Sequence, residues 1–231
     1  MAPPPYRDEA VWNGSGYYSQ PKHTGMRQGA MLYNSAKRMM DIAGSLIGLL
    51  LLSPIIVMVA VLIKLEEPRG PILFYQTRIG KNEKPFRMYK LRSMAVNAEE
   101  KLKDLLDQNE ISGAMFKMKD DPRITKVGKW IRKTSIDELP QLFNVLRGDM
   151  SLVGPRPPLL REVAEYSEYD KLRLSVTPGC TGMWQVSGRN SLTFKQMVEL
   201  DIAYIQKRCL WLDIKIMLKT VKVMITPQDA F

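Results

Sequence analysis

The longest apolar stretch of the chain covers residues 42–63 and contains no charged side chain. A helix of about 20 residues is long enough to cross the hydrocarbon core of a bilayer. Residues 33–41, which precede it, mix apolar positions with Lys37, Arg38 and Asp41. This pattern predicts a membrane helix whose first turns lie at the membrane surface, rather than a helix buried in a soluble core.

Ser53 and Pro54 interrupt the apolar segment near its middle. Pro54 lacks the amide hydrogen that would bond the carbonyl of Leu50, and its ring clashes there, so we expect a kink. A serine hydroxyl such as that of Ser53 can bond the freed carbonyl. Each half of the helix is then about 10–12 residues long, which covers one leaflet only.

Positive residues flank the segment on both sides, and such residues favour the cytoplasmic face of a membrane. They are Lys37 and Arg38 before it, and Lys64, Arg69, Arg78 and Lys81 after it. A helix that dips into the bilayer and returns satisfies both flanks. On these residues alone, re-entry and a kinked spanning helix remain two open alternatives.

The remainder of the chain predicts short elements of both kinds. Strand-like runs at residues 72–75 and 85–90 flank a polar turn at 79–82, which predicts a hairpin. A turn at 177–182 precedes a short strand at 184–187. Apolar spacing predicts helices over residues 97–109, 127–133, 159–169, 194–208 and 211–225.

The two ends of the chain differ in character. Residues 1–29 hold many prolines and glycines without an apolar period, so we expect no stable structure and no signal peptide there. The helix at 211–225 carries Lys215, Lys219 and Lys222 beside a wide apolar face. That pattern suits a helix in the headgroup layer of a membrane, and it equally suits an ordinary core helix.

One more helix is predicted from Ser135, whose side chain suits the N-cap position. Glu138 lies three residues further on and completes the spacing of a capping box. The expected buried stripe of this helix consists of Leu139, Leu142, Phe143 and Leu146. A role of Glu138 as a cap partner alone stays open.

Composition narrows the classes of function. The chain has 231 residues and a net charge of +10, which attracts phosphates in nucleic acid, anionic lipid or a sugar nucleotide. No nucleic-acid-binding motif is present, so nucleic acid is not an expected partner. Cys180 and Cys209 are far apart and favour a reduced domain. His23 is the only histidine, which argues against histidine catalysis and a histidine-bound zinc ion.

The candidate chemistry lies in residues 134–157, where Asp137 and Glu138 are adjacent. A carboxylate can act as a nucleophile on phosphorus, but two neighbouring carboxylates oppose each other's ionisation. Mg²⁺ resolves this conflict and polarises phosphate oxygens. Arginines suited to the remaining phosphate oxygens are Arg132, Arg156 between Pro155 and Pro157, and Arg189.

These pieces, in this order, resemble the bacterial sugar transferases known as monotopic phosphoglycosyl transferases. The resemblance covers some 190 residues, from about Lys37 to the C-terminus. It rests on residues 37–38, 53–54, 74–80, 89–94, 121–125, 135–157, 178–182 and 188–190. The resemblance implies transfer of a sugar-1-phosphate from a UDP-sugar to undecaprenyl phosphate, with release of UMP.

The resemblance also implies a role for each matching residue. Asp137 would form a covalent phosphosugar intermediate, and Glu138 would help to bind Mg²⁺. Phosphate binding would fall to Arg132, Arg156, Arg189 and the turn prolines Pro155 and Pro157. Ser53 and Pro54 match the break that makes the membrane helix re-entrant, and Lys37 and Arg38 would lie near the lipid phosphate.

The expected architecture is an α+β fold, mostly helical, with a re-entrant membrane helix kinked at Ser53 and Pro54 and one small β-hairpin. We expect a polar leader over 1–30, the membrane helix over 31–66, and over 67–231 a cytosol-facing catalytic domain with interfacial helices. The location is the bacterial inner membrane, with membrane lipid, downstream glycosyltransferases and a second copy of the chain as partners.

Two other classes compete with this interpretation. A basic membrane-anchored scaffold would explain the charge and the C-terminal helix, but not the acid pair beside the Pro-Arg-Pro turn. A polytopic lipid-phosphate transferase would require a true spanning helix. The sequence does not identify the sugar or the polymer that the product enters.

Overall fold

The computed structural model describes residues 11–12, 18–19, 24–102, 105, 118, 121–188 and 191–225. The chain divides into two units, Met1–Lys37 and Arg38–Phe231. In the first unit, β1 (Val11–Trp12) pairs antiparallel with β2 (Tyr18–Ser19), and the long helix α1 (Thr24–Glu66) begins. Most of the expected leader at 1–30 lies outside the described residues.

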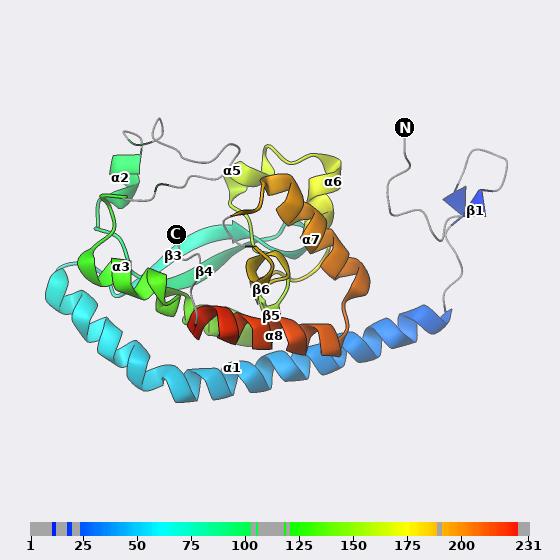
Figure 1. Ribbon diagram of the computed structural model, residues 1–231, viewed down its shortest axis with the longest axis horizontal. Helices are drawn as coiled ribbons and strands as arrows, with labels where there is room; N and C mark the ends of the chain where they lie inside the picture. Colours follow the sequence, from blue (N-terminus) through cyan, green and yellow to red (C-terminus); the bar gives the residue numbers. More distant parts are fainter. Residues whose placement is uncertain are drawn as a thin grey trace. The chain divides into compact units, whose positions relative to one another are not determined.

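The second unit combines many short helices with two small strand pairs, which confirms the expected mostly helical α+β composition (Figure 1). After α1, its α-helices are α2 (Ala98–Leu102), α3 (Lys126–Lys133), α4 (Gln141–Arg147), α5 (Leu160–Val163), α6 (Glu168–Lys171), α7 (Phe194–Lys207) and α8 (Leu210–Ile225). Its 3₁₀ turns are η1 (Lys81–Glu83), η3 (Ile136–Glu138), η4 (Leu172–Ser175) and η5 (Trp184–Val186). Its strands are β3 (Leu73–Ile79), β4 (Pro85–Leu91), β5 (Ser151–Val153) and β6 (Gly179–Thr181).

The predicted hairpin is confirmed: β3 and β4 pair antiparallel from Leu73 opposite Leu91 to Ile79 opposite Pro85. The strands are longer than the apolar runs suggested because the turn is tight. Asn82 at φ 55° and Glu83 at φ 61° reverse the chain within a few residues. Helices α3, α7 and α8 also match their predictions, while the predicted helix at 97–109 is described only over α2.

The predicted helix from Ser135 is wrong in its first turns. Ser135 adopts a left-handed conformation at φ 56° and its side chain makes no cap bond. Residues 136–138 form η3, and α4 begins only after Pro140. Pro140 has no amide hydrogen for the carbonyl of Ile136, which the amide of Leu139 bonds instead at 3.2 Å in a 3₁₀ pattern.

The predicted buried stripe of this helix is also wrong. The buried side of α4 is formed by Gln141, Asn144 and Val145, whereas the side chain of Phe143 is 50% exposed. Asn144 faces inward because its amide group bonds the backbone of β4. The apolar positions Leu139, Leu142 and Leu146 are then only half-buried.

Three further predictions differ from the structure. The segment at 177–182 contains strand β6, which pairs in parallel with β5. The predicted strand at 184–187 is the turn η5, and the predicted helix at 159–169 is divided between α5 and α6. β6 approaches β5 so closely that a Cβ on Gly179 would lie 2.0 Å from the nitrogen of Gly154. Only glycine permits this contact, and glycine is also a turn residue, which explains the error.

Within the second unit, α1 contacts the rest of the fold near both of its ends. Near the start, the Asp41 carboxylate accepts bonds from the Ser151 hydroxyl at 3.0 Å and the Leu152 amide at 2.9 Å. Near the end, Val59 and Ile63 pack in a core cluster with Leu91 of β4 and Ile131 of α3. The first contact is polar and the second apolar.

The end of α1 also completes the cap of a neighbouring helix. The carboxylate of Glu66 accepts bonds from the amides of Lys126 and Val127, at 2.7 and 3.1 Å. These amides begin α3 and have no partner within that helix. The last turn of α1 is thereby fixed beside α3.

Between these two contacts, α1 exposes a broad apolar surface. Leu46, Ile47, Leu50, Leu51, Val57 and Met58 are all exposed, and the exposed Val61 and Leu65 continue this surface to the end of the helix. Residues 31–66 are the one stretch of the described chain long and apolar enough to cross a membrane. Such a surface on a soluble monomer would be unfavourable, so membrane association follows.

The helix is continuous through Pro54 but bent, as its cyan C-terminal part turns upward in Figure 1. The Ser53 hydroxyl donates to the carbonyl of Leu50 at 2.8 Å. This bond satisfies the carbonyl that Pro54 deprives of an amide, as the sequence predicted.

Candidate active site

The acid pair lies in η3, between α3 and α4. Asp137 is 6% exposed, and Glu138 reaches toward strand β4. On β4, Lys90 pairs with Glu138, with 2.6 Å between its Nζ and Oε1. Sequence reasoning missed Lys90, because a lysine in a strand gives no signal of what it faces.

Asn144 fixes the spacing between the acid pair and Lys90. Its side chain accepts a bond from the Tyr89 amide at 3.0 Å and donates to the Arg87 carbonyl at 2.7 Å. In this way it pairs with the edge of β4 as a further strand would. Because Lys90 follows Tyr89 directly, the fully buried Asn144 holds α4 and Lys90 in one rigid arrangement.

Electrostatics divide the two carboxylates. Burial would raise the pKa of Glu138, but Lys90, together with Arg156 and Arg78, outweighs burial and lowers that pKa to about 2. Burial raises the pKa of Asp137 to about 6; Lys90 opposes this rise and the charge of Glu138 adds to it. Glu138 therefore carries the stable negative charge, and Asp137 is the group whose protonation responds to pH near neutrality.

The Pro-Arg-Pro turn directly follows β5 and supplies Arg156. Pro155 and Pro157 are buried, while Arg156 is half-buried and lowers the pKa of Glu138. The turn is held by the buried Arg78 of β3, which donates to the Pro157 carbonyl at 3.1 Å. Burial, followed by the charge of Arg156, lowers the pKa of Arg78 to about 10, so it stays a cation near neutral pH.

Of the other predicted site arginines, the structure describes Arg132 but not Arg189. Arg132 is exposed in the last turn of α3, and its charge lowers the pKa of Asp137, whereas its role in phosphate binding remains a prediction. Arg189 lies outside the described residues. Lys37 is on α1 in the first unit, and the assignment of both Lys37 and Arg38 to a lipid phosphate remains a prediction.

Arg38 has a structural role that the sequence did not indicate. Its guanidinium donates to the carbonyls of Val145 and Leu146, at 2.5 and 2.7 Å. These carbonyls end α4, where a cation is favourable. Arg38 therefore ties α1 to the helix that carries Asn144.

The site offers two carboxylates to a metal ion, those of Asp137 and Glu138. No cluster of three or more His, Cys, Asp or Glu side chains suited to a metal occurs in the described part of the chain. Mg²⁺ commonly uses one or two carboxylates and completes its shell with water and substrate phosphates. The acid pair fits that mode, and does not form a metal cage by itself.

Comparison with known proteins decides the family. A profile described as bacterial sugar transferase matches residues 32–227. The chain belongs to the bacterial sugar transferase family.

Three relatives illustrate its range. The chain is 54% identical over 196 residues to the galactosyl transferase CpsE of Streptococcus agalactiae, which covers 84% of this chain and 43% of that protein. It is 46% identical over 199 residues to the undecaprenyl-phosphate galactose phosphotransferase of Salmonella typhimurium, covering 84% and 41%. It is 36% identical over 200 residues to the exopolysaccharide production protein ExoY of Rhizobium meliloti, covering 85% and 88%. The chain thus spans less than half the length of the first two sugar transferases and most of the third.

The acid pair should titrate near pH 6, since burial raises the pKa of Asp137 to about 6. Lys90→Met removes the cation that lowers the pKa of Asp137 most, so the protonated form of Asp137 should persist to higher pH. Carbodiimide reacts with protonated carboxyls. The rate at which it modifies Asp137, measured from roughly pH 4 to 8, therefore gives the titration midpoint of Asp137 in the wild type and in Lys90→Met. Lys101→Met, at an exposed position of α2, is the control. An unchanged midpoint in Lys90→Met would contradict this electrostatic account.

Proposed function

We propose that this sugar transferase moves a sugar-1-phosphate from a UDP-sugar to undecaprenyl phosphate. The observation that carries the proposal is a buried Asp137 whose partner Glu138 is already neutralised by Lys90. Relatives named as undecaprenyl-phosphate galactose and glucose phosphotransferases support the substrate class. Membership of the family supports the reaction class.

The proposed reaction has two steps. A carboxylate oxygen of Asp137 attacks the β-phosphorus of the UDP-sugar, the bond to the bridging oxygen breaks, and UMP leaves. A phosphate oxygen of the lipid then attacks the same phosphorus and releases the Asp137 carboxylate. The product is a lipid diphosphate that carries the sugar.

The charges around Asp137 suit this chemistry. A buried carboxylate with a raised pKa is poorly solvated and is a stronger nucleophile once ionised. Its ionised form must meet a diphosphate that carries negative charge of its own. Lys90, Arg78, Arg132 and Arg156 supply positive charge around the pair, which lowers that repulsion and stabilises the phosphorus transition state.

Mg²⁺ would be held by Asp137 and Glu138 together with substrate phosphates. The ion supplies charge neutralisation on the diphosphate. Because Lys90 already occupies one oxygen of Glu138, the pair alone should bind Mg²⁺ weakly, and the substrate should strengthen that binding.

Removing the metal should therefore stop turnover reversibly. EDTA is expected to abolish UMP release from a UDP-sugar, and excess Mg²⁺ should restore it. Ca²⁺, with longer bonds and looser geometry, should restore less. Full activity in EDTA would remove Mg²⁺ from the proposal and leave the arginines and Lys90 as the only neutralising groups.

Replacement of the nucleophile gives the most direct test. Asp137→Ala and Asp137→Asn should each lower UMP release by about a thousandfold or more, because no covalent intermediate can form. Each variant is assayed with undecaprenyl phosphate and a panel of different UDP-sugars. Glu165→Gln, at an exposed position, is the control. Mass spectrometry should detect the phosphosugar on Asp137 alone. A phosphosugar adduct on another residue would contradict the assignment of Asp137 as the nucleophile. Binding to vesicles without any UMP release would favour the membrane-anchored scaffold instead.

We further propose that α1 is re-entrant and that the catalytic domain lies on the cytoplasmic face of the inner membrane. Asp41 and Val59 both contact the same folded unit, although the helix between them has an exposed apolar surface. A helix that crossed the bilayer would carry its two ends to opposite faces. The contacts at both ends therefore favour entry and exit on one side.

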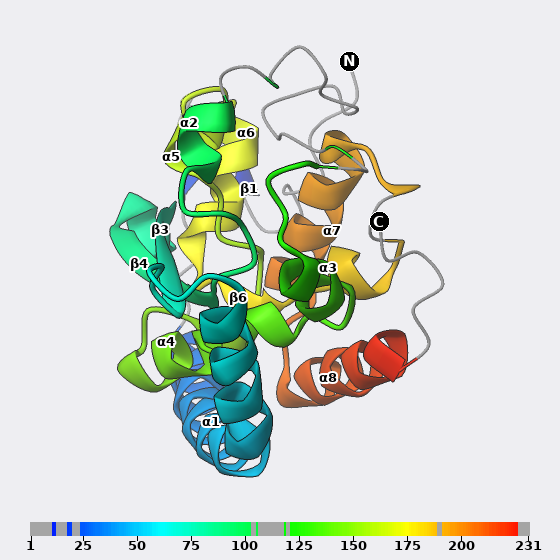
Figure 2. The same ribbon diagram turned by 90° about the vertical axis from the view of Figure 1, so that its left-hand side faces the viewer.

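Two other helices add apolar surface on the same side of the second unit. Figure 2 shows α4 and α8 with α1 in the lower half of the view, below α5 and α6, and in Figure 1 α8 again lies low, beside α1. Phe143 on α4 and Trp211, Leu218 and Val221 on α8 are exposed. This arrangement supports the headgroup-layer interpretation of α8, although Ile216 of the same helix packs in the core.

Cysteine labelling tests the topology. A cysteine is introduced at Gln20 or at Lys81 in a Cys209→Ser background, since Cys209 is exposed whereas Cys180 packs against a core cluster. Re-entry predicts that a membrane-impermeant maleimide labels both positions from the cytoplasmic side and neither from the periplasmic side. Labelling of the two positions from opposite sides would establish a spanning helix instead.

A further inference from the structure

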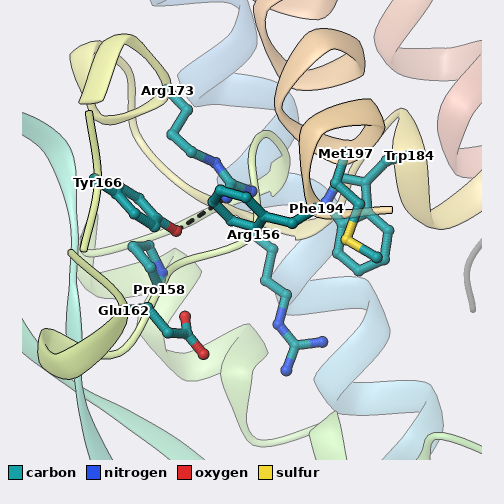
Figure 3. A pocket seen from close by; sticks show the side chains of 8 residues that line it. All are labelled: Arg156, Pro158, Glu162, Tyr166, Arg173, Trp184, Phe194 and Met197. Carbon is teal, nitrogen blue, oxygen red and sulfur yellow. Dashed lines mark hydrogen bonds between the residues drawn. The ribbon is translucent and has the colours of Figure 1, made fainter. Parts of the chain in front are cut away.

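A small pocket lies beside the acid pair but does not include it. Six of its lining residues bear on its function: Arg156, Glu162, Tyr166, Arg173, Trp184 and Phe194 (Figure 3). In chain order they come from the Pro-Arg-Pro turn, α5, the residues between α5 and α6, η4, η5 and the start of α7. The space measures about 260 Å³ out to its open mouth, and its inner end has room for about one water-sized group.

Two hydrogen-bond donors of this pocket have no partner among the described residues. They are the indole Nε1 of Trp184 and the Nε of Arg173, both buried and both on side chains no more than 6% exposed. A buried donor without an acceptor is costly, and native proteins rarely retain one. Two in the same pocket point to a ligand that presents acceptor oxygens.

The orientation of the Arg173 guanidinium is fixed by its surroundings. Arg173 forms a buried ion pair with Asp201 of α7 and donates to the Tyr166 hydroxyl at 3.0 Å. Neither bond uses its Nε, which remains for another acceptor. A donor held this rigidly suits a ligand with acceptors in a fixed geometry.

Aromatic rings form the remaining wall. The rings of Tyr166 and Phe194 lie 5.5 Å apart, and Phe194 is half-buried. Figure 3 shows these rings and Trp184 on one side, while the guanidinium of Arg156 and the carboxylate of Glu162 project away from the rings. The pocket thus combines an aromatic, donor-bearing end with a charged end.

The charged end connects the pocket to the acid pair. Arg156 lines the pocket and also lowers the pKa of Glu138. A ligand whose phosphate reached Arg156 could place another group among the rings. Asp137 and Glu138 do not line the pocket, so that other group is removed from the reacting phosphorus.

We propose that this pocket binds the uracil base of the sugar nucleotide; the proposal rests on the function proposed above. Uracil has a flat face for Phe194 and two carbonyl oxygens, one of which fits the inner end beside Trp184 and Arg173. The base is separated from the β-phosphorus by a ribose and a further phosphate, whereas the sugar is bonded to that phosphate group directly. A sugar in contact with the reacting phosphorus would lie against Asp137, outside this pocket.

Trp184→Phe tests the proposal because it removes the donor and keeps an aromatic ring. Calorimetry on the full chain in detergent compares UMP with ribose 5-phosphate, which lacks the base, and with hexose 1-phosphates, which carry only the sugar. We expect affinity for UMP to fall roughly threefold to tenfold, as for the loss of one hydrogen bond. Affinity for the other two ligands should not change. Trp130→Phe, the same change at a partly exposed position of α3, is the control.

Kinetics and a second variant complete the test. Trp184→Phe should raise KM for the UDP-sugar by the same factor and leave kcat unchanged. Phe194→Leu, at the mouth of the pocket, should weaken UMP binding without removing a donor, which covers the case that Trp184→Phe fails to fold.

A wild type that binds UMP and ribose 5-phosphate equally overturns the proposal, as does weaker binding of hexose 1-phosphates alone in Trp184→Phe. UMP binding needs no turnover, so an inactive protein that binds UMP through this pocket would refute the proposed function and not the pocket.

Discussion

The structure depends on the attachment of one apolar helix segment to a folded unit at two places, Asp41 and the pair Val59 and Ile63. Asp41 is a buried carboxylate on an apolar helix, and the bonds that Ser151 and Leu152 donate to it help to offset the cost of its burial. Val59 and Ile63 make the second attachment through apolar packing. The apolar surface between the two attachments favours a lipid environment. Because α1 is attached to the second unit at both places, the position of α1 in a bilayer would also determine the position of that unit.

From α1 the constraint passes to the acid pair through a short series of contacts. Arg38 bonds the end of α4, Asn144 of α4 bonds the edge of β4, and β4 carries Lys90 to Glu138. Each contact joins a rigid element to the next. The chemistry follows from the last one, because Lys90 keeps Glu138 charged while Asp137, deeper in the fold, has a raised pKa. Two chemically similar neighbours are thus suited to different tasks by their surroundings.

Local patterns in the sequence were enough for the elements whose signals are local. The apolar segment, the hairpin and helices α3, α7 and α8 were predicted to within a few residues. The bond from the Ser53 hydroxyl to the Leu50 carbonyl followed from the missing amide hydrogen of Pro54. The capping-box prediction at Ser135 failed because Pro140 favours a 3₁₀ turn, and β6 was missed because its glycine serves a close backbone contact.

The candidate site was only partly accessible to the same reasoning. Asp137, Glu138 and Arg156 could be named because they lie close together in the sequence, and a family resemblance gave each a proposed role. Lys90 and Arg78 come from a hairpin some fifty residues or more earlier, and long-range pairing brings them to the site. The sequence could not predict the two donors of the pocket, Trp184 Nε1 and Arg173 Nε, for a related reason. A tryptophan or arginine without a hydrogen-bond partner can be recognised only when its neighbours in space are known.

The cap that Arg38 places on α4 has a consequence for the order in which the protein matures. The residues that end α4 emerge from the ribosome about a hundred positions after Arg38, and α3 similarly follows the Glu66 that caps it. By then the apolar segment has already been synthesised, so the later helices can fold against a partner that is in place. A fragment that starts after Glu66 would lack both caps and the Asp41 attachment, and would expose the face they cover. The apolar helix is thus a template against which α3 and α4 assemble.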